Sequence, residues 1–433
     1  MQRSRSPVKP LLEDVGGECR LTAADRNLAM NMVYGVLRRR QYLECLIGHL
    51  GRHPLHKLAP FVLHGLEVGL FQLLFLDRIP ESAAVNETIN AVKAAGLPER
   101  LQGFVNGILR ESIRQRATLP GPDTDPDSGR PWLNHPRWLT ERWRKRFGEA
   151  EMRRICAGNN QESRLVLRIN TTATTRDKYK TSLDAAGIPC RDGLFAPQAL
   201  VLATYQGAIP LLPGYSEGHF LVQDEATQLA PLLLGPFRRE GRYLDACAGL
   251  GGKTCTLVEM EPELGLRTTA LEPEAHRYRK LGENLARLYP GNGCTTRQCT
   301  LQDFAAAGDE RFDGVLVDAP CSGTGVTGRH PDIRWNRAEA DLGRYQTVQL
   351  EILAQAAALV ATGGVLVYAT CSLEPEENEE VIRLFLDRHV DFRLTAPEPL
   401  LPPAAGRFVE DRFFRPRPDA TIDGFFAARL IRR

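Results

Sequence analysis

The sequence predicts a multidomain protein with three parts: an all-α bundle, a small α/β module and a doubly wound, Rossmann-like α/β domain. At 433 residues the chain is too long for a single hydrophobic core. Apolar residues recur at helical spacing in its first part, whereas its last part alternates β-branched strands with helical segments. A linker over 119–135, rich in Pro, Gly and Asp up to Pro131, separates the first part from the rest. We therefore expect the bundle over 1–118, the module over 136–215 and the doubly wound domain over 216–433.

The composition is that of an ordinary globular protein, with 43% hydrophobic and 25% charged residues. No apolar run approaches the roughly 18 residues that cross a bilayer, and the basic start lacks the apolar segment of a secretory signal. We therefore expect a cytoplasmic protein with no membrane partner. The ten cysteines are scattered without a Cys-x-x-Cys pair, so we expect reduced thiols and no metal site.

The first part of the chain is expected to fold as four or five helices with short connections. The first helix spans 21–50 and begins with a capping box formed by Thr22 and Asp25. The others span about 58–75, 82–95 and 100–115. These segments contain no activated nucleophile or ligand cluster, and the run Arg38-Arg39-Arg40 favours binding over catalysis.

The segment from Arg130 to Lys180 is strongly basic, with 13 Lys and Arg against 5 Asp and Glu, a local net charge of +8. Trp and Tyr side chains lie among these cations. Basic residues interleaved with aromatic rings are typical of a surface that holds a nucleic-acid backbone and stacks its bases. The alternative is a solvated basic helix face. The candidate RNA contacts in this module are Arg142, Arg144, Lys145, Arg146 and Arg168.

Strand and helix signals alternate from about 221 onward, which predicts parallel βαβ units. Strands are expected at 243–246, 268–271, 295–298, 315–317 and 365–369. Helices are expected at about 252–260, 274–288, 338–361 and 376–387. The closing segment, 421–431, is expected to form an edge hairpin strand.

Two of these strands run directly into polar loops that contain a cysteine. The strand 315–317 is followed by Asp318 and Cys321, and the strand 365–369 is followed by Cys371. Open α/β sheets bind their ligands at the carboxyl ends of the strands, so these side chains are expected where chemistry occurs. The two cysteines could face one another there. A lone cysteine is otherwise a buried small hydrophobe, and we favour that interpretation for the other eight.

A glycine-rich loop, 245–254, follows the first strand of this domain and opens a helix. It is not a P-loop, because Cys247 stands where the first Gly would be, and Thr254 replaces the third Gly of a dinucleotide fingerprint. Glu272 ends the second strand, 23 residues after Gly249, where an acid can accept hydrogen bonds from both ribose hydroxyls. These features favour an adenosine ligand without a 2′-phosphate.

Asp303, beyond the third strand, is a candidate to hold the adenine amino group, and the alternative is an acid that caps a helix. The candidate cofactor residues are Cys247, Ala248, Gly249, Leu250, Gly251, Gly252, Lys253, Glu272, Asp303 and Asp318.

The paired cysteines suit the alkylation of cytosine at carbon 5. That carbon is a poor nucleophile, but addition of a thiolate to carbon 6 makes it electron-rich enough to attack a methyl donor. A base then removes the hydrogen on carbon 5 and the thiol is expelled. The scheme needs a thiolate, a group on the ring edge and a base, and Cys371, Asp318 and Cys321 are candidates for these roles.

Both cysteine loops resemble those of RNA cytosine-5 methyltransferases that use S-adenosylmethionine. The matching blocks are Asp318-Ala-Pro-Cys-Ser-Gly-Thr-Gly, Arg329-His-Pro-Asp-Ile-Arg-Trp, Tyr368-Ala-Thr-Cys-Ser-Leu-Glu-Pro-Glu-Glu-Asn and Asp423-Gly-Phe-Phe. The first part resembles NusB-type RNA-binding helical domains, through blocks such as Val33-Tyr-Gly-Val-Leu-Arg-Arg, Gly69-Leu-Phe-Gln-Leu-Leu-Phe, Ala84-Val-Asn-Glu and Gly103-Phe-Val-Asn-Gly-Ile-Leu-Arg. Nearly the whole chain therefore resembles the bacterial 16S ribosomal RNA cytosine-5 methyltransferases of the Sun/Fmu (RsmB) type.

The resemblance implies that Cys371 is the nucleophile that bonds carbon 6, that Cys321 acts in product release or as the base, and that Asp318 holds the cytosine ring edge. It further implies that 247–253, Glu272 and Asp303 surround S-adenosylmethionine. Arg329 and His330 become additional candidate RNA contacts. The expected partner is 16S rRNA, naked or in early assembly, and we expect a monomer.

Three alternatives stay open at the level of sequence. DNA cytosine-5 methyltransferases take their nucleophile from a Pro-Cys pair, which here would be Cys321. The substrate could be transfer RNA, or the chain could be a non-catalytic RNA-binding assembly factor, since fold alone does not establish activity. Leu250 and Glu272 depart from the usual Pro and Asp of the family, which bears on cofactor affinity more than on activity.

Overall fold

In a computed structural model of the protein, residues 8–121, 130–202, 205, 207–291 and 293–433 are described. Contacts divide the chain into two units, Met1–Gln161 with Thr327–Arg337, and Glu162–Val326 with Ala338–Arg433. Each unit is described by itself below. The centre of the expected linker, 122–129, lies outside the described residues.

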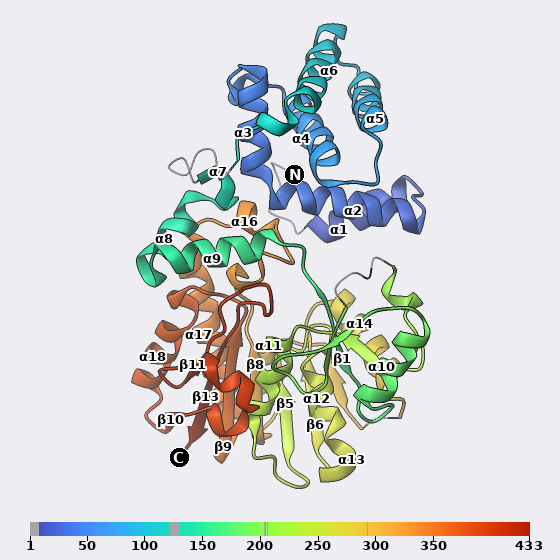
Figure 1. Ribbon diagram of the computed structural model, residues 1–433. Coiled ribbons are helices and arrows are strands. Elements are labelled where there is room, and N and C mark those ends of the chain that lie inside the picture. The colour runs from blue at the N-terminus through green and yellow to red at the C-terminus, as the bar shows by residue number, and fades with distance from the viewer. Residues whose placement is uncertain (1–7, 122–129, 203–204, 206, 292) are drawn as a thin grey trace. The chain divides into compact units, whose positions relative to one another are not determined.

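The first unit is built from helices in its described residues (Figure 1). They are α1 (Val8–Glu18), α2 (Ala23–Arg38), α3 (Arg40–Gly51), α4 (Pro60–Phe75), α5 (Glu81–Ala94), α6 (Glu99–Arg114), α7 (Arg130–Leu133), α8 (Arg137–Phe147), α9 (Glu149–Asn160) and α16 (Ile333–Asn336). The helix expected over 21–50 is two helices, because Arg39 leaves the helical conformation at φ −120° and ψ 17°. The capping box is confirmed, since Thr22 Oγ1 accepts the Asp25 N–H at 3.2 Å and donates to the Asp25 carboxylate at 2.6 Å.

Helices α2 to α6 pack around a core of Leu, Ile, Val and Phe side chains. One glycine of the NusB-like blocks, Gly35 on α2, is required by the packing of two helices. A Cβ at this position would lie 1.9 Å from the ring of Phe71 on α4, so only glycine lets the two helices approach this closely.

The segment 327–337 comes from a distant part of the chain but belongs to this helical unit. Its Arg334 is 1% exposed. The guanidinium donates to the carbonyl oxygens of Arg38 at 3.3 Å and Asn134 at 3.0 Å, and to Oδ1 of Asn160 at 2.6 Å. Asn160 ends α9. By their contacts α8 and α9, which we expected in the small α/β module, group with the helices of this unit.

The second unit contains a small antiparallel sheet of four strands in the order β2 (Arg191–Asp192), β3 (Ala199–Leu202), β1 (Leu165–Ile169) and β4 (Phe220–Val222). Helix α10 (Arg176–Ala185) precedes β2. Apolar residues of β1 and β3, among them Val166 and Val201, pack into the core of the larger sheet in the same unit.

The larger sheet has nine strands and carries the predicted alternation of strands and helices. Its strands run in the order β11, β12, β13, β9, β8, β5, β6, β7, with β10 also paired to β13. Their bounds are β5 (Arg242–Asp245), β6 (Arg267–Leu271), β7 (Thr295–Arg297), β8 (Phe312–Asp318), β9 (Val360–Thr370), β10 (Phe392–Thr395), β11 (Val409–Glu410), β12 (Phe413–Phe414) and β13 (Phe426–Arg432). The strands β5 to β9 are parallel, and β13 pairs with β9 antiparallel.

Both faces of this sheet are covered, as a doubly wound fold requires. Alternate residues of β8 and β9 enter two separate cores, so Leu316 and Val367 face one side, whereas Val317 and Leu366 face the other. The covering helices are α11 (Glu225–Leu229), α12 (Thr254–Glu259), α13 (Glu261–Leu264), α14 (Ala275–Leu288), α15 (Leu301–Ala306), α17 (Asp341–Leu359) and α18 (Glu379–Arg388) (Figure 1).

The closing strand differs from its predicted position. We expected an edge strand, but β13 lies inside the sheet, with β9 on one side and β10 and β12 on the other. Its pattern of Phe and Ala is therefore that of a strand buried on both faces, as Ala427 and Ala428 are. Among the helices of the described ranges, none has the length and apolar character of a bilayer span.

Candidate active site

The carboxyl ends of β8 and β9 bring two cysteines together. These strands are parallel neighbours in which Asp318 lies opposite Ala369. Cys321 and Cys371 follow them in the chain, and their Sγ atoms are 3.2 Å apart. Both are free, half-buried thiols. The prediction that the two strand ends place these cysteines face to face is confirmed.

Asp318 lies at the point where the strand order of the sheet reverses, between β8 and β5, and it pairs with a lysine from the glycine-rich loop. Lys253 Nζ donates to Asp318 Oδ2 at 2.5 Å, and the lysine side chain is 11% exposed. Burial opposes its charge, but the carboxylates of Asp318 and Asp245 raise the pKa of Lys253 above its ordinary value. The Cys371 sulfur acts in the same direction.

The surroundings of the two sulfurs differ in charge. The hydrogen bond with Cys371 and burial raise the pKa of Cys321 well above its ordinary value, and the carboxylates of Glu377 and Asp318 add to this effect. Cys371 instead interacts electrostatically with Lys253, whose pKa it helps to raise. The arrangement therefore favours a neutral thiol at Cys321 that donates its hydrogen bond to the sulfur of Cys371.

A buried glutamate that sequence reasoning missed lies behind both cysteine loops. Glu377 is 0% exposed. Its Oε1 accepts the backbone N–H of Ser322 at 2.7 Å, and its Oε2 accepts the hydroxyls of Ser322 and Ser372, each at 2.5 Å. The sequence did contain a signal for this residue: both cysteines are followed by serine, and the second Cys-Ser pair is followed by an acidic run. Buried serine hydroxyls need hydrogen-bond acceptors, and a nearby acid can supply them.

The glycine-rich loop after β5 has a backbone conformation that favours glycine at two positions. Gly249 and Gly251 have φ values of +56° and +87°. A Cβ on Gly251 would also lie 2.7 Å from a methyl carbon of Leu281. Leu250 between them is 54% exposed, so it packs little against the loop. The loop therefore presents its backbone at the carboxyl end of β5.

Other residues of this loop fix its base. The N–H of Ala248 donates to the carbonyl of Leu271 at 2.9 Å, which joins the loop to the end of β6. Cys247 is surrounded by carboxylates, and burial together with Asp245 raises its pKa, so it stays a neutral thiol. A Cβ added to Gly252 would lie 3.5 Å from the side-chain amide nitrogen of Gln223.

Asp245, the last residue of β5, provides a pH-dependent contribution to stability. Burial raises its pKa from 3.8 to about 6, although the hydrogen bond from Thr254 Oγ1 at 2.7 Å opposes this shift. Between these two values the folded state keeps a proton that the unfolded chain releases, so the free energy of unfolding falls as the pH rises. At about 1.4 kcal/mol for each pKa unit, the full contribution is roughly 3 kcal/mol.

We therefore expect Asp245→Asn to become progressively more stable than the natural protein between pH 4 and pH 7. Urea unfolding at a series of pH values, followed by far-UV circular dichroism, measures this difference. The matched control is Asp309→Asn, an exposed acid, whose stability should follow that of the natural protein at every pH. Parallel curves for Asp245→Asn and the natural protein would contradict the assignment.

The two acids proposed for the adenosine end lie in different settings. Glu272 follows β6 and is buried, and its Oε1 accepts the backbone N–H of Glu274 at 2.9 Å. Asp303 is exposed and forms a capping box with Thr300 at the start of α15, with contacts of 2.6 and 3.1 Å. The capping role considered for Asp303 is thus present, and its contact with adenine stays a prediction.

The predicted RNA contacts of the helical unit are accessible to different degrees. Arg144 and Lys145 are exposed on α8, whereas Arg142 and Arg146 are half-buried, and Arg146 lies over the Phe147 ring at 5.0 Å. In the segment 327–337, Arg329 is half-buried and His330 is exposed.

The structure corrects the expectation for Arg168. Its side chain is 2% exposed and forms an ion pair with Glu259 at the end of α12. The guanidinium therefore joins β1 of the small sheet to helix α12 and is not presented to an RNA backbone.

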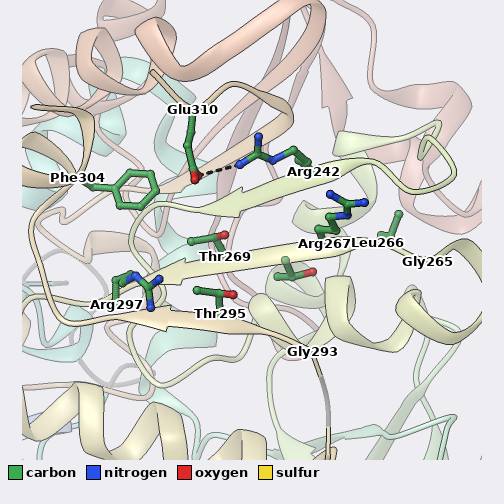
Figure 2. A pocket seen from close by; sticks show the side chains of 11 residues that line it. Arg242, Gly265, Leu266, Arg267, Thr269, Gly293, Thr295, Arg297, Phe304 and Glu310 are labelled. Atoms are coloured by element: carbon green, nitrogen blue, oxygen red, sulfur yellow. Dashed lines mark ion pairs between the residues drawn. The ribbon is translucent and has the colours of Figure 1, made fainter. Parts of the chain in front are cut away.

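A separate groove of about 640 Å³ lies at the amino ends of β5 and β6, at the opposite end of the strands from the cysteines (Figure 2). Its polar lining includes Arg267, Arg297 and Arg242, the last of which pairs with Glu310 at 2.9 Å. It takes no part in the site described above. In the described ranges no group of three or more His, Cys, Asp and Glu side chains is arranged to hold a metal ion.

Comparison with known proteins identifies the family. Residues 231–431 match the family described as 16S rRNA methyltransferase RsmB/F, residues 5–114 match the NusB family, and residues 135–207 match the ferredoxin-like domain of RsmF/B-like methyltransferases. The ribosomal RNA small subunit methyltransferase B of Escherichia coli O6:K15:H31 (strain 536 / UPEC) is 36% identical over 433 residues, 100% of this chain and 95% of that protein. The chain belongs to the RsmB/F family of 16S rRNA methyltransferases.

The chain is also similar to a further relative and to a solved methyltransferase structure. The probable ribosomal RNA small subunit methyltransferase B of Synechocystis sp. (strain PCC 6803) is 36% identical, over 95% of this chain and 92% of that protein. The crystal structure of a methyltransferase homolog protein from Pyrococcus horikoshii has a TM-score of 0.58 and 26% identity, over 70% of this chain and 96% of that one. The three-part fold and the family resemblance seen in the sequence are confirmed. Membership of a methyltransferase family implies S-adenosylmethionine as the methyl donor.

Proposed function

We propose that this RsmB/F family member methylates carbon 5 of a cytosine in 16S rRNA through a covalent bond between Cys371 and carbon 6. The observation that carries the proposal is the pair of thiols 3.2 Å apart at the ends of β8 and β9, beside the Lys253–Asp318 ion pair. A single cysteine would serve as nucleophile in many reactions. Two cysteines beside a carboxylate provide one sulfur to attack the pyrimidine ring, a second to assist release of the product, and an acid to hold the ring edge.

The charges around the pair support Cys371 as the attacking sulfur. Its thiolate would be stabilised by the ammonium of Lys253, whereas the carboxylates near Cys321 oppose a second negative charge. The sulfur electron pair forms the bond to carbon 6, and the electrons of the ring double bond shift to carbon 5. After the methyl group is added, carbon 5 gives its hydrogen as a proton to a base or a water molecule in the site. The electrons of that C–H bond rebuild the ring double bond, and the Cys371 sulfur leaves carbon 6 as a thiolate with the electrons of the C–S bond.

Cys321 and Asp318 are proposed to assist this cycle. The thiol of Cys321 is within 3.2 Å of the sulfur that must leave, so it can hydrogen-bond to the departing thiolate. Asp318 is 32% exposed and held by Lys253, which leaves its second oxygen available for the amino group and the adjacent ring nitrogen of cytosine.

The residues at the carboxyl ends of β5 and β6 fit an adenosyl ligand. The backbone of Gly249 to Gly251 and the buried carboxylate of Glu272 lie on adjacent strand ends, as a ribose-binding acid next to a glycine loop should. When bound there, S-adenosylmethionine supplies an electrophilic methyl group. Lys253 belongs to this loop and pairs with Asp318 at 2.5 Å, so it links the proposed cofactor loop to the proposed cytosine site.

Transfer of labelled methyl groups tests the substrate and the product together. We expect naked 16S rRNA to be methylated faster than assembled small subunits or transfer RNA, because a cytosine must be unstacked to enter the site. Digestion of the product to nucleosides should yield 5-methylcytidine. A preference for transfer RNA would contradict the substrate, and any other methylated nucleoside would contradict the chemistry.

A further inference from the structure

Glu377, the buried glutamate behind the cysteine loops, accepts hydrogen bonds from several residues around the two cysteines. Besides Ser322 and Ser372, Glu377 Oε1 accepts a hydrogen bond from Nε2 of Gln349 at 3.1 Å, and the same Nε2 donates to the carbonyl of Pro320 at 3.0 Å. Burial raises the pKa of Glu377, and these hydrogen bonds oppose the rise. Burying a carboxylate is costly, and a buried group of this kind is well accommodated only when its oxygens are hydrogen-bonded.

The two serines that bind Glu377 directly follow the two cysteines. The hydroxyls of Ser322 and Ser372 are 3.2 Å apart, the same separation as that of the cysteine sulfurs. Since each serine is covalently adjacent to its cysteine, a single acceptor for both hydroxyls fixes how closely the two sulfurs approach.

Further hydrogen bonds join the same two loops. Gly325 N–H donates to the Cys371 carbonyl at 2.9 Å, and the Leu373 N–H donates to Thr324 Oγ1 at 2.9 Å. The first of these bonds joins backbone atoms and the second uses the Thr324 hydroxyl, which also lies 3.3 Å from the Ser372 hydroxyl. Glu377 differs from these groups because its carboxylate accepts the hydroxyls of both Ser322 and Ser372.

We propose that Glu377 is a positioning residue that sets the separation and alignment of the Cys321 and Cys371 sulfurs by binding Ser322 and Ser372 together. Its effect on methylation rests on the function proposed above, whereas its effect on the sulfur separation does not. Cys371, Glu377 and Asp318 all raise the pKa of the Cys321 thiol, and Cys321 also interacts electrostatically with the buried Tyr368. A carboxylate at Glu377 thus also helps to keep this thiol protonated while Cys371 attacks.

Phenylarsine oxide measures the sulfur separation without RNA or cofactor. The reagent condenses with two neighbouring thiols to form two arsenic–sulfur bonds and one water molecule, and peptide mass spectrometry identifies which thiols are bridged. We expect it to bridge Cys321 and Cys371 in the natural protein, and we expect Glu377→Ala to weaken this bridging about 10-fold. Equal bridging in Glu377→Ala and the natural protein would overturn the proposal.

Steady-state kinetics measure the consequence for methylation. We expect Glu377→Ala to lower kcat by about 100-fold, the loss that a displacement of about 1 Å causes, while KM for S-adenosylmethionine changes less than about twofold. Glu377→Gln should recover part of kcat, because its amide oxygen still accepts from the serine hydroxyls whereas its NH₂ group opposes the Ser322 N–H. The matched control, Glu351→Gln on an exposed face of α17, should retain full activity and bridging.

Variants of the serines keep the proposal testable if Glu377→Ala does not fold. Ser322→Ala and Ser372→Ala each remove one hydroxyl from Glu377, and the double variant removes both. We expect kcat and arsenical bridging to fall stepwise across this series. A double variant with unchanged kcat and bridging would overturn the proposal. If bridging falls in these variants as expected but the natural protein forms no covalent adduct with RNA, only the proposed reaction is contradicted, and the positioning role of Glu377 stands.

Discussion

Replacing Cys371 with Ala is expected to abolish methyl transfer, with a loss in kcat of at least about 10⁴-fold. A reaction that depends on a covalent intermediate loses nearly all of its rate with the nucleophile, and other parts of the site cannot replace it. Labelled methyl transfer to naked 16S rRNA measures the rate, and a denaturing gel shows whether protein and RNA are covalently joined. Cys371→Ala should give neither methylation nor an adduct.

The companion variant should behave in the opposite way. With Cys321→Ala, attack by Cys371 remains possible but release is impaired, so a covalent RNA adduct should accumulate and survive the gel. Cys190→Ala, another half-buried thiol, is the control and should match the natural protein in both readouts. An adduct that accumulates in Cys371→Ala and is absent in Cys321→Ala would mean that the roles of the two sulfurs are exchanged.

The pairing of these cysteines was predictable from sequence because it follows from strand register. Two apolar strands that end in polar loops place their next residues at one edge of a parallel sheet, and neighbouring strands place them about 5 Å apart. The capping box at Thr22 was predictable for a similar reason, since it depends on residues three positions apart. Each of these inferences needs only local pattern and a general rule of topology.

The features that sequence reasoning missed depend on contacts between distant segments. Glu377 binds Ser322, which lies 55 positions earlier in the chain. Arg168 looked like an RNA contact because its neighbours are basic, but its partner, Glu259, lies 91 positions away. Arg334 belongs to a motif in the methyltransferase part of the sequence, yet its buried contacts are all within the helical unit. Neither hydrophobic periodicity nor motif spacing predicts contacts between residues that lie so far apart in the chain.

Removing the charge of Lys253 is expected to have the second-largest effect, because this residue belongs to the proposed cofactor loop and pairs with Asp318 of the proposed cytosine site. Lys253→Met should lower kcat by about 10² to 10³-fold, the usual loss when one well-placed charged donor is removed. The substitution also removes a cation whose charge interacts with the Cys371 sulfur, so the attacking thiolate loses electrostatic support. Steady-state methyl transfer measures the loss, and Lys280→Met, which removes an exposed ion pair with Glu283, serves as the control.

A double-mutant cycle with Asp318→Asn separates the two contributions of this lysine. If Lys253 acted only by holding Asp318, the single variants would lose the same activity and the double variant would lose no more. We expect instead that Lys253→Met is slower than Asp318→Asn. The ammonium is hydrogen-bonded to Asp318 at 2.5 Å, and its charge also interacts with the Cys371 sulfur, so its removal affects the ring contact and the nucleophile together.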